Sequence, residues 1–110
     1  MANPQGNVGE LVDIRPLDSD LASSQRTILL RAEHVEIARL VVPAGKEIPE
    51  HRAKGEIVVQ CLEGRVAYKV FGKTLTLEAG KLLYMPMGEL HSVKGIEDAS
   101  LLLTIFLPKQ

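Results

Sequence analysis

The chain has 110 residues, 45% of them apolar, and its 13 basic and 14 acidic side chains give a formal net charge of −1 at pH 7. A chain of this length is expected to fold as one domain around one core. The basic residues are scattered among acids, which argues against nucleic acid or an anionic membrane as a partner and favours a small neutral molecule.

Cysteine usage and the N-terminal residues bear on the compartment. Cys61 is the single cysteine, so no disulfide can form within the chain, which favours a reducing environment. The first nine residues lack the basic start and apolar run of a secretory signal, and no stretch of about eighteen apolar residues is present. We therefore expect a cytoplasmic protein that does not enter the membrane.

Short apolar runs alternate with glycine and proline turns from Glu10 onward, a spacing typical of an all-β sandwich or barrel. The first expected strand is 11–15, followed by a helical turn or two at 17–22. The clearest hairpin is expected to turn at Gly72 and Lys73. The other expected strands are 26–31, 35–42, 48–53, 57–62, 65–71, 73–77, 81–85, 91–94 and 100–107.

Two segments share an arrangement of glycine and histidine. In the second, Gly80 is followed by Pro86, Gly88 and His91, with five, one and two residues between them. In the first, five residues separate Gly45 from His51, and Gly64 closes the hairpin that follows.

Paired in this way, the segments resemble the two motifs of the cupin superfamily, over about residues 35–107. The resemblance implies a cupin double-stranded β-helix, a jelly-roll-like antiparallel barrel. The single cupin domain would then cover residues 1–110, with an N-terminal arm at 1–25 and the barrel core at 26–107.

The sequence departs from the metal-binding pattern that the resemblance implies, which is three histidines and one acidic or amide residue. Ala53 stands where the family usually places its second histidine, and Ile57 stands at the position of the Glu or Gln ligand. Glu56 is adjacent, but successive side chains of a strand point to opposite faces, so its carboxylate is expected to project away from the pocket. Only His51 and His91 remain as candidate metal ligands.

Alternation along 57–62 places Ile57, Val59 and Cys61 toward the interior of the barrel. We therefore expect a largely apolar pocket that holds both histidines. Its predicted lining residues are His51, Ala53, Ile57, Val59, Cys61, His91 and Val93. Such a pocket suits a hydrophobic or aromatic small molecule with one or two polar groups.

The activity remains open at this stage. The favoured interpretation is a small-molecule-binding cupin. The alternative is a metal-dependent oxygenase or isomerase in which His51 and His91 hold a divalent transition metal weakly, with an incomplete protein ligand set. A metal-free histidine base, as in the epimerases that share the architecture, and a ligand-sensing module are further hypotheses.

Three other residues or faces have alternative interpretations. His34 is either a third ligand or a strand-edge histidine, and Cys61 is either a reactive thiol or a small buried residue. The outward side chains of 57–62 include Val58 and Leu62, which need cover from another sheet or another subunit. A homodimer is the expected assembly.

Overall fold

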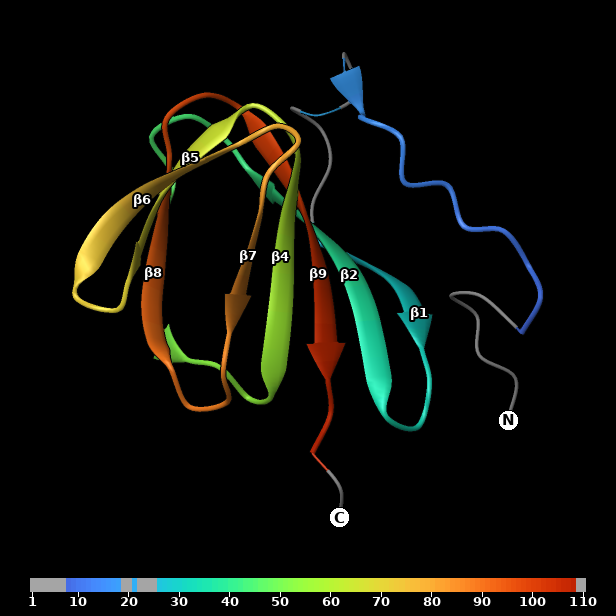
Figure 1. Cartoon of the computed structure of the whole chain (residues 1–110). Helices are drawn as coiled ribbons and strands as arrows, with labels where there is room; N and C mark the ends of the chain where they lie inside the picture. The colour runs from blue at the N-terminus through green and yellow to red at the C-terminus, as the bar shows by residue number, and fades with distance from the viewer. Residues whose placement is uncertain (1–7, 19–20, 22–25, 109–110) are drawn as a thin grey trace.

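Two antiparallel sheets face each other in the part of the chain that the structure describes (Figure 1). The computed structural model describes residues 8–18, 21 and 26–108. Within these residues the strands are β1 Thr27–Arg31, β2 Val35–Val42, β3 Glu47–Arg52, β4 Glu56–Glu63, β5 Arg65–Val70, β6 Lys73–Glu78, β7 Leu82–Met85, β8 Leu90–Gly95 and β9 Ala99–Phe106. None of the described residues lies in a helix long and apolar enough to cross a lipid bilayer.

The chain passes repeatedly from one sheet to the other. The five-stranded sheet has the order β1-β2-β9-β4-β7, and the four-stranded sheet has the order β3-β8-β5-β6. Only β1 with β2 and β5 with β6 are consecutive strands within one sheet. This topology confirms the predicted all-β, jelly-roll-like double-stranded β-helix.

The interior follows the predicted alternation of side chains. On β4, Ile57, Val59 and Cys61 are buried, whereas Val58 is half-buried and Gln60 is exposed. Their inward neighbours on β9 include Leu101 and Leu103. The core therefore lies between the sheets, where branched apolar side chains of facing strands interdigitate.

The predicted strand at 11–15 is wrong. These residues lie beside the five-stranded sheet, where the Arg39 guanidinium donates to the carbonyl oxygens of Arg15 at 2.7 Å and Asp13 at 3.3 Å. Side-chain hydrogen bonds thus satisfy carbonyl groups that a strand would pair in a ladder. Within the helical turn predicted at 17–22, Asp18 and Leu21 lie in 3₁₀ turns, but the φ angle of Asp18 is 51°, outside the helical range, and 19–20 and 22 lie outside the described residues.

The β5–β6 hairpin turns one residue earlier than predicted, at Phe71 and Gly72. Their φ angles are 55° and 72°, and Val70 pairs with Lys73 across the turn. Two consecutive positive φ angles are the signature of a type I′ turn, which favours Asn or Gly at its first central position. Phenylalanine is an unfavourable choice there because its Cβ crowds the backbone in this conformation.

Replacing Phe71 by Asn is therefore expected to stabilise the protein by about 0.5–1 kcal/mol. The Phe71 side chain is 47% exposed, so its removal loses only part of the burial of a core phenylalanine. The urea midpoint of Phe71→Asn measures the effect, with Phe71→Ala as the control that lacks the asparagine preference. A lower midpoint for Phe71→Asn would show that contacts of the ring outweigh the strain.

Candidate functional site

The two predicted histidines meet across neighbouring strands. His51 on β3 and His91 on β8 are paired in the antiparallel ladder. Their ring centroids are 4.2 Å apart and the ring planes are inclined by 59°. The register of the four-stranded sheet, which the sequence alone does not display, therefore creates the pair.

Both imidazoles are held in the same way by their own strand. His51 Nδ1 lies 2.9 Å from the carbonyl oxygen of Pro49, and His91 Nδ1 lies 3.1 Å from that of Glu89. A carbonyl oxygen can only accept, so each Nδ1 carries the proton and donates. In the neutral rings, each Nε2 is then left as an acceptor, and it has no hydrogen-bond partner among the described residues.

The environments of the two rings differ. His91 is only 4% exposed and stacks on Tyr68, with ring centroids 5.8 Å apart and planes inclined by 9°. His51 is exposed. Burial lowers the pKa of His91, the hydrogen bond to Glu89 opposes this, and neighbouring His51 lowers it further. His91 is therefore neutral at physiological pH and offers a lone pair rather than a charge.

The histidine pair forms part of the wall of a cavity of about 520 Å³ between the sheets. The cavity lies on the side where β1 and β3 are the edge strands. Five of the residues predicted for the pocket line it: His51, Ala53, Ile57, His91 and Val93.

Val59 and Cys61, which were also predicted for the pocket, do not line this cavity. They point inward as expected but lie farther along β4, toward the turn at Gly64, where core side chains enclose them. The Cys61 thiol donates to the Glu63 carbonyl oxygen at 3.3 Å, and burial raises its pKa. It is a small buried residue rather than a reactive thiolate.

Most of the remaining cavity wall is hydrocarbon. Leu101, Leu103 and Ile105 contribute from β9, and Ile28, Leu40 and Ile48 from the strands on either side of the opening. Tyr68 adds a phenol at the wall beside His91. Burial raises the pKa of Tyr68, so its hydroxyl stays protonated and can donate a hydrogen bond.

Charged residues that the sequence analysis did not assign to the pocket also line the cavity. They are Arg26, Arg31, Glu36, Arg52 and Lys54. The arginines at 26 and 31 come from the β1 edge of one sheet, Arg52 and Lys54 come from the end of β3 and the following turn, and Glu36 comes from β2 beside β1. Alternation along β2 provides one usable signal, because Glu36 shares the inward parity of Ala38 and Leu40.

The residues around the histidine pair do not fit a metal centre. Among the described residues, no three His, Cys, Asp or Glu side chains are grouped so that they could hold one ion. Ala53 and Ile57 present only carbon at the positions where further ligands would stand. Glu56 lies away from the cavity and accepts a hydrogen bond from the Tyr84 hydroxyl at 3.0 Å. His34 is an exposed residue in the β1–β2 turn, with its ring 3.6 Å from Glu33.

The lowered pKa of His91 predicts that the protein loses stability in mild acid. Between the usual histidine value of about 6.5 and the lower folded value, the unfolded chain binds a proton that the folded protein does not. The free energy of unfolding should therefore fall as the pH drops below about 6.5. Urea midpoints at pH 7.5 and 5.5 measure the slope.

The matched controls are His91→Gln and His34→Gln. His91→Gln should flatten the pH dependence over this interval, because it removes the buried titrating ring. His34→Gln should leave the slope unchanged, since the His34 side chain is 64% exposed. An unchanged slope in His91→Gln would contradict the assignment.

Comparison with known proteins gives a consistent result. The model of the cupin domain family matches residues 38–106. A cupin superfamily protein from Desulfitobacterium hafniense aligns with a TM-score of 0.75 and 16% identity over 90% of this chain and 100% of its own. A conserved protein of unknown function from Streptococcus pyogenes aligns with a TM-score of 0.72 and 22% identity, over 98% of this chain and 100% of its own. An RmlC-like cupin with a double-stranded β-helix fold from Methanocaldococcus jannaschii aligns with a TM-score of 0.72 and 16% identity, over 93% of this chain and 94% of its own. No curated protein matches.

Proposed function

Because the chain belongs to the cupin domain family, we propose that it is a small cupin that binds a small apolar molecule in the cavity between its sheets. The observation that carries the proposal is the His51–His91 pair. Both Nδ1 atoms are engaged by backbone carbonyls, so two Nε2 acceptors remain at the wall of a cavity that is lined mostly by hydrocarbon. The ligand is therefore an apolar compound that carries a hydrogen-bond donor.

The shape and chemistry of the cavity support binding. A volume of about 520 Å³ falls within the usual range for sites that take small organic molecules. Hydrocarbon side chains from β9 can cover an apolar body, whereas the imidazoles and the Tyr68 hydroxyl supply a few directed polar contacts. Burial of apolar surface contributes most of the affinity, and the polar groups select the orientation.

The metal-dependent alternative is not favoured by any observation of the site. Two imidazoles are fewer than the three protein ligands that catalytic centres of this kind normally use. The metal-free base hypothesis is also unsupported, because the Nδ1 partners of both rings are backbone carbonyls rather than a carboxylate that would stabilise an imidazolium. Binding is the function that these residues support best.

A neutral fluorescent probe tests the proposal. N-Phenyl-1-naphthylamine has an apolar aromatic body and one N–H donor, and its emission rises in an apolar site. We expect it to bind one to one, and Val93→Phe should weaken binding at least about tenfold by filling the cavity. Thr76→Phe is the matched control, because Thr76 is exposed on the outward face of β6 and does not line the cavity.

The proposal is wrong if the wild-type protein does not bind the probe, or if Val93→Phe binds it as tightly as Thr76→Phe does. Near-ultraviolet circular dichroism checks that both variants keep their tertiary structure. His51→Gln provides a second test at an exposed position, and it should weaken binding without unfolding the protein, because it replaces the acceptor Nε2.

We propose in addition that the protein is a homodimer that uses the outward face of the five-stranded sheet. Leu82, Tyr84 and Phe106 are 63%, 48% and 44% exposed on this face. The register places Val58 opposite Tyr84, so that Val58 extends this exposed group, whereas Leu102 on the same face is already buried. A second copy could bury the same apolar rows. Light scattering should give a dimer mass that Leu82→Asp converts to a monomer mass, and a monomeric wild type would refute it.

A further inference from the structure

The rim of the cavity concentrates positive charge. Among the described residues, four basic side chains line the cavity, whereas one acidic side chain does. The rim thus has an excess of three positive charges in a chain with a net charge of −1. A like-charged cluster at the mouth of an apolar cavity focuses the potential on whatever enters it.

Two of the four cations have an internal counter-ion. Glu36 lies 3.5 Å from Arg26 and 3.0 Å from Arg31, and its side chain is only 13% exposed. This carboxylate is therefore the counter-ion of the two arginines beside and on β1, Arg26 and Arg31. It does not compensate Arg52 and Lys54, which come from the end of β3 and the following turn.

Arg52 is held in place without being neutralised. Its Nη1 donates to the carbonyl oxygen of Gly88 at 3.0 Å, and this acceptor carries no formal charge. Lys54 forms no ion pair or hydrogen bond with the described residues. The nearby acids are turned elsewhere, because Glu56 accepts from Tyr84 and Glu50 lines a separate depression with Lys69.

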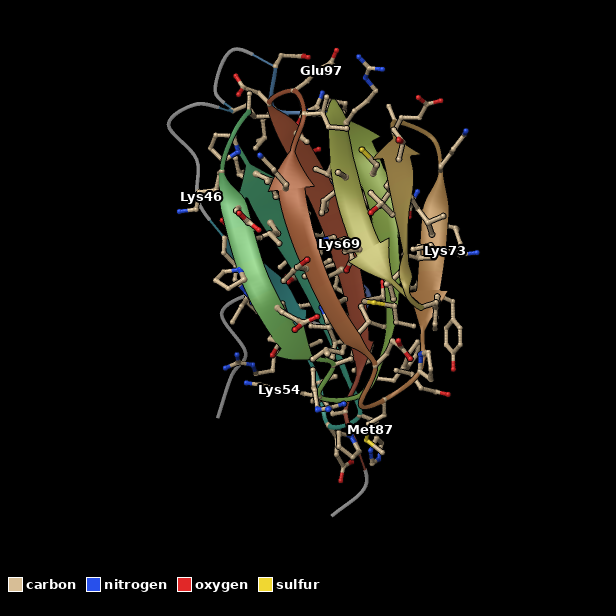
Figure 2. The ribbon with its side chains drawn as sticks, turned by 90° about the vertical axis from the view of Figure 1, so that its left-hand side faces the viewer. Lys46, Lys54, Lys69, Lys73, Met87 and Glu97 are labelled. Atoms are coloured by element: carbon tan, nitrogen blue, oxygen red, sulfur yellow. The ribbon has the colours of Figure 1, made fainter. Side chains whose placement is uncertain are left out.

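The turn that carries these two cations is fixed to the neighbouring turn. Ala53 N donates to the Glu89 carbonyl at 3.0 Å, and Gly88 N donates to the Ala53 carbonyl at 2.8 Å. Figure 2 shows Lys54 at this end of the molecule near Met87, with Lys46 at the opposite end of β3. The backbone bonds hold the two cations beside the cavity mouth, as a preorganised anion site requires.

We infer that the ligand of this cavity is an amphipathic organic anion, with its apolar body between the sheets and its acid group at Arg52 and Lys54. The inference rests on the proposed function, since it specifies the ligand of the same cavity. The guanidinium and ammonium groups donate to the acid group, and the histidine Nε2 atoms accept from a hydroxyl or amine of the ligand. A neutral ligand would leave the excess rim charge without a counter-ion.

Two probes with the same body test the inference. 8-Anilino-1-naphthalenesulfonate is N-phenyl-1-naphthylamine with one added sulfonate, so the ratio of their dissociation constants isolates the acid group. We expect the sulfonate to bind at least about tenfold more tightly at low salt, the gain of one charge-assisted hydrogen bond. Added salt should lower the affinity for the sulfonate and leave the affinity for the neutral probe unchanged.

The test variant carries both Arg52→Gln and Lys54→Gln. The matched control is Lys46→Gln, which removes a positive charge at the other end of β3, away from the cavity. The double variant should reduce the affinity for the sulfonate to that of the neutral probe, and Lys46→Gln should change neither affinity. Val93→Phe should lower the affinity for both probes, which shows that the sulfonate occupies the cavity and not the outer sheet face.

The outcomes separate the two proposals. If both probes bind the wild type equally, or if the double variant keeps the preference for the sulfonate, the anion inference is overturned while cavity binding stands. If neither probe binds, the proposed function fails and the inference fails with it. If the rim cations serve only solubility, the double variant keeps wild-type affinity for both probes, which also overturns the inference.

Discussion

Replacing Gly64 by alanine is expected to lower the free energy of unfolding by more than about 3 kcal/mol or to prevent folding. Gly64 links β4 to β5 with a φ angle of 77°, where an L side chain is strained. An added Cβ would also overlap the carbonyl oxygen of Asp98 and lie 2.7 Å from the Cα atom of Ala99. Both neighbours are backbone atoms at the start of β9, so neither can move without displacing the strand.

Gly80→Ala is the matched control for this prediction. Gly80 has a φ angle of 89°, but a Cβ there would meet no atom within 4 Å. Its cost should be the conformational penalty alone, about 1–2 kcal/mol. Chemical denaturation of both variants measures the difference. Equal midpoints would show that the backbone near Asp98 and Ala99 moves to accommodate the added Cβ. Gly64 would then be needed only for its positive φ angle.

Replacing Glu63 by alanine should cost about 2–4 kcal/mol and release the segment 8–18 from the sheet. The Glu63 carboxylate accepts from the backbone N–H groups of Leu17 at 2.9 Å and Asp18 at 3.0 Å, and from the hydroxyl of Ser100. Ser100 is fully buried, so its hydroxyl would lose its partner. Buried Arg39, whose charge acts on Glu63, would lose a counter-ion.

Urea unfolding measures the loss of stability, and limited proteolysis within 8–18 measures the release. Glu97→Ala is the control, because the Glu97–Arg65 pair joins two exposed side chains and should contribute less than about 1 kcal/mol. If Glu63→Ala and Glu97→Ala have the same stability, the carboxylate does not anchor the segment.

Glu63 also predicts a second acid transition, separate from that of His91. Burial acts to raise the pKa of Glu63, but the hydrogen bonds from Ser100, Leu17 and Asp18 and the charge of Arg39 lower it overall. A lowered folded pKa gives stability that is present above the unfolded value, about 4.3 for glutamate, and is lost as the pH falls through the folded one. Glu63→Gln should therefore flatten the stability curve below about pH 4.3, whereas the effect of His91→Gln begins at higher pH, below the usual histidine value of about 6.5.

Much of the fold could be predicted because its signals are local. Alternation along β4 fixes which residues face the core, and positive φ angles at Gly45, Gly64, Gly80 and Gly88 explain the glycine spacing of both motifs. The failure at 11–15 has the opposite cause. A run of alternating residues there satisfies its carbonyls through the side chain of Arg39, and no local pattern reports that long-range donor.

The candidate site was only partly predictable. The resemblance to the cupin motifs implied that His51 and His91 would meet, and the ladder pairs them. Val59 and Cys61 were predicted to line the cavity but do not, because alternation gives the direction of a side chain and not its position along the barrel axis. The basic rim was missed because its residues come from two separate places, 26–31 and 52–54, and the net charge of the chain is close to zero.

The sequence by itself determined the all-β class and the inward set of β4, since each depends on the type and spacing of neighbouring residues. The tertiary structure alone decided that Glu36 pairs with Arg26 and Arg31 while Arg52 and Lys54 stay uncompensated at the same opening. The physical reason is that electrostatic interactions depend on distances in space. Those distances are set by the meeting of two sheet edges that lie about twenty residues apart along the chain.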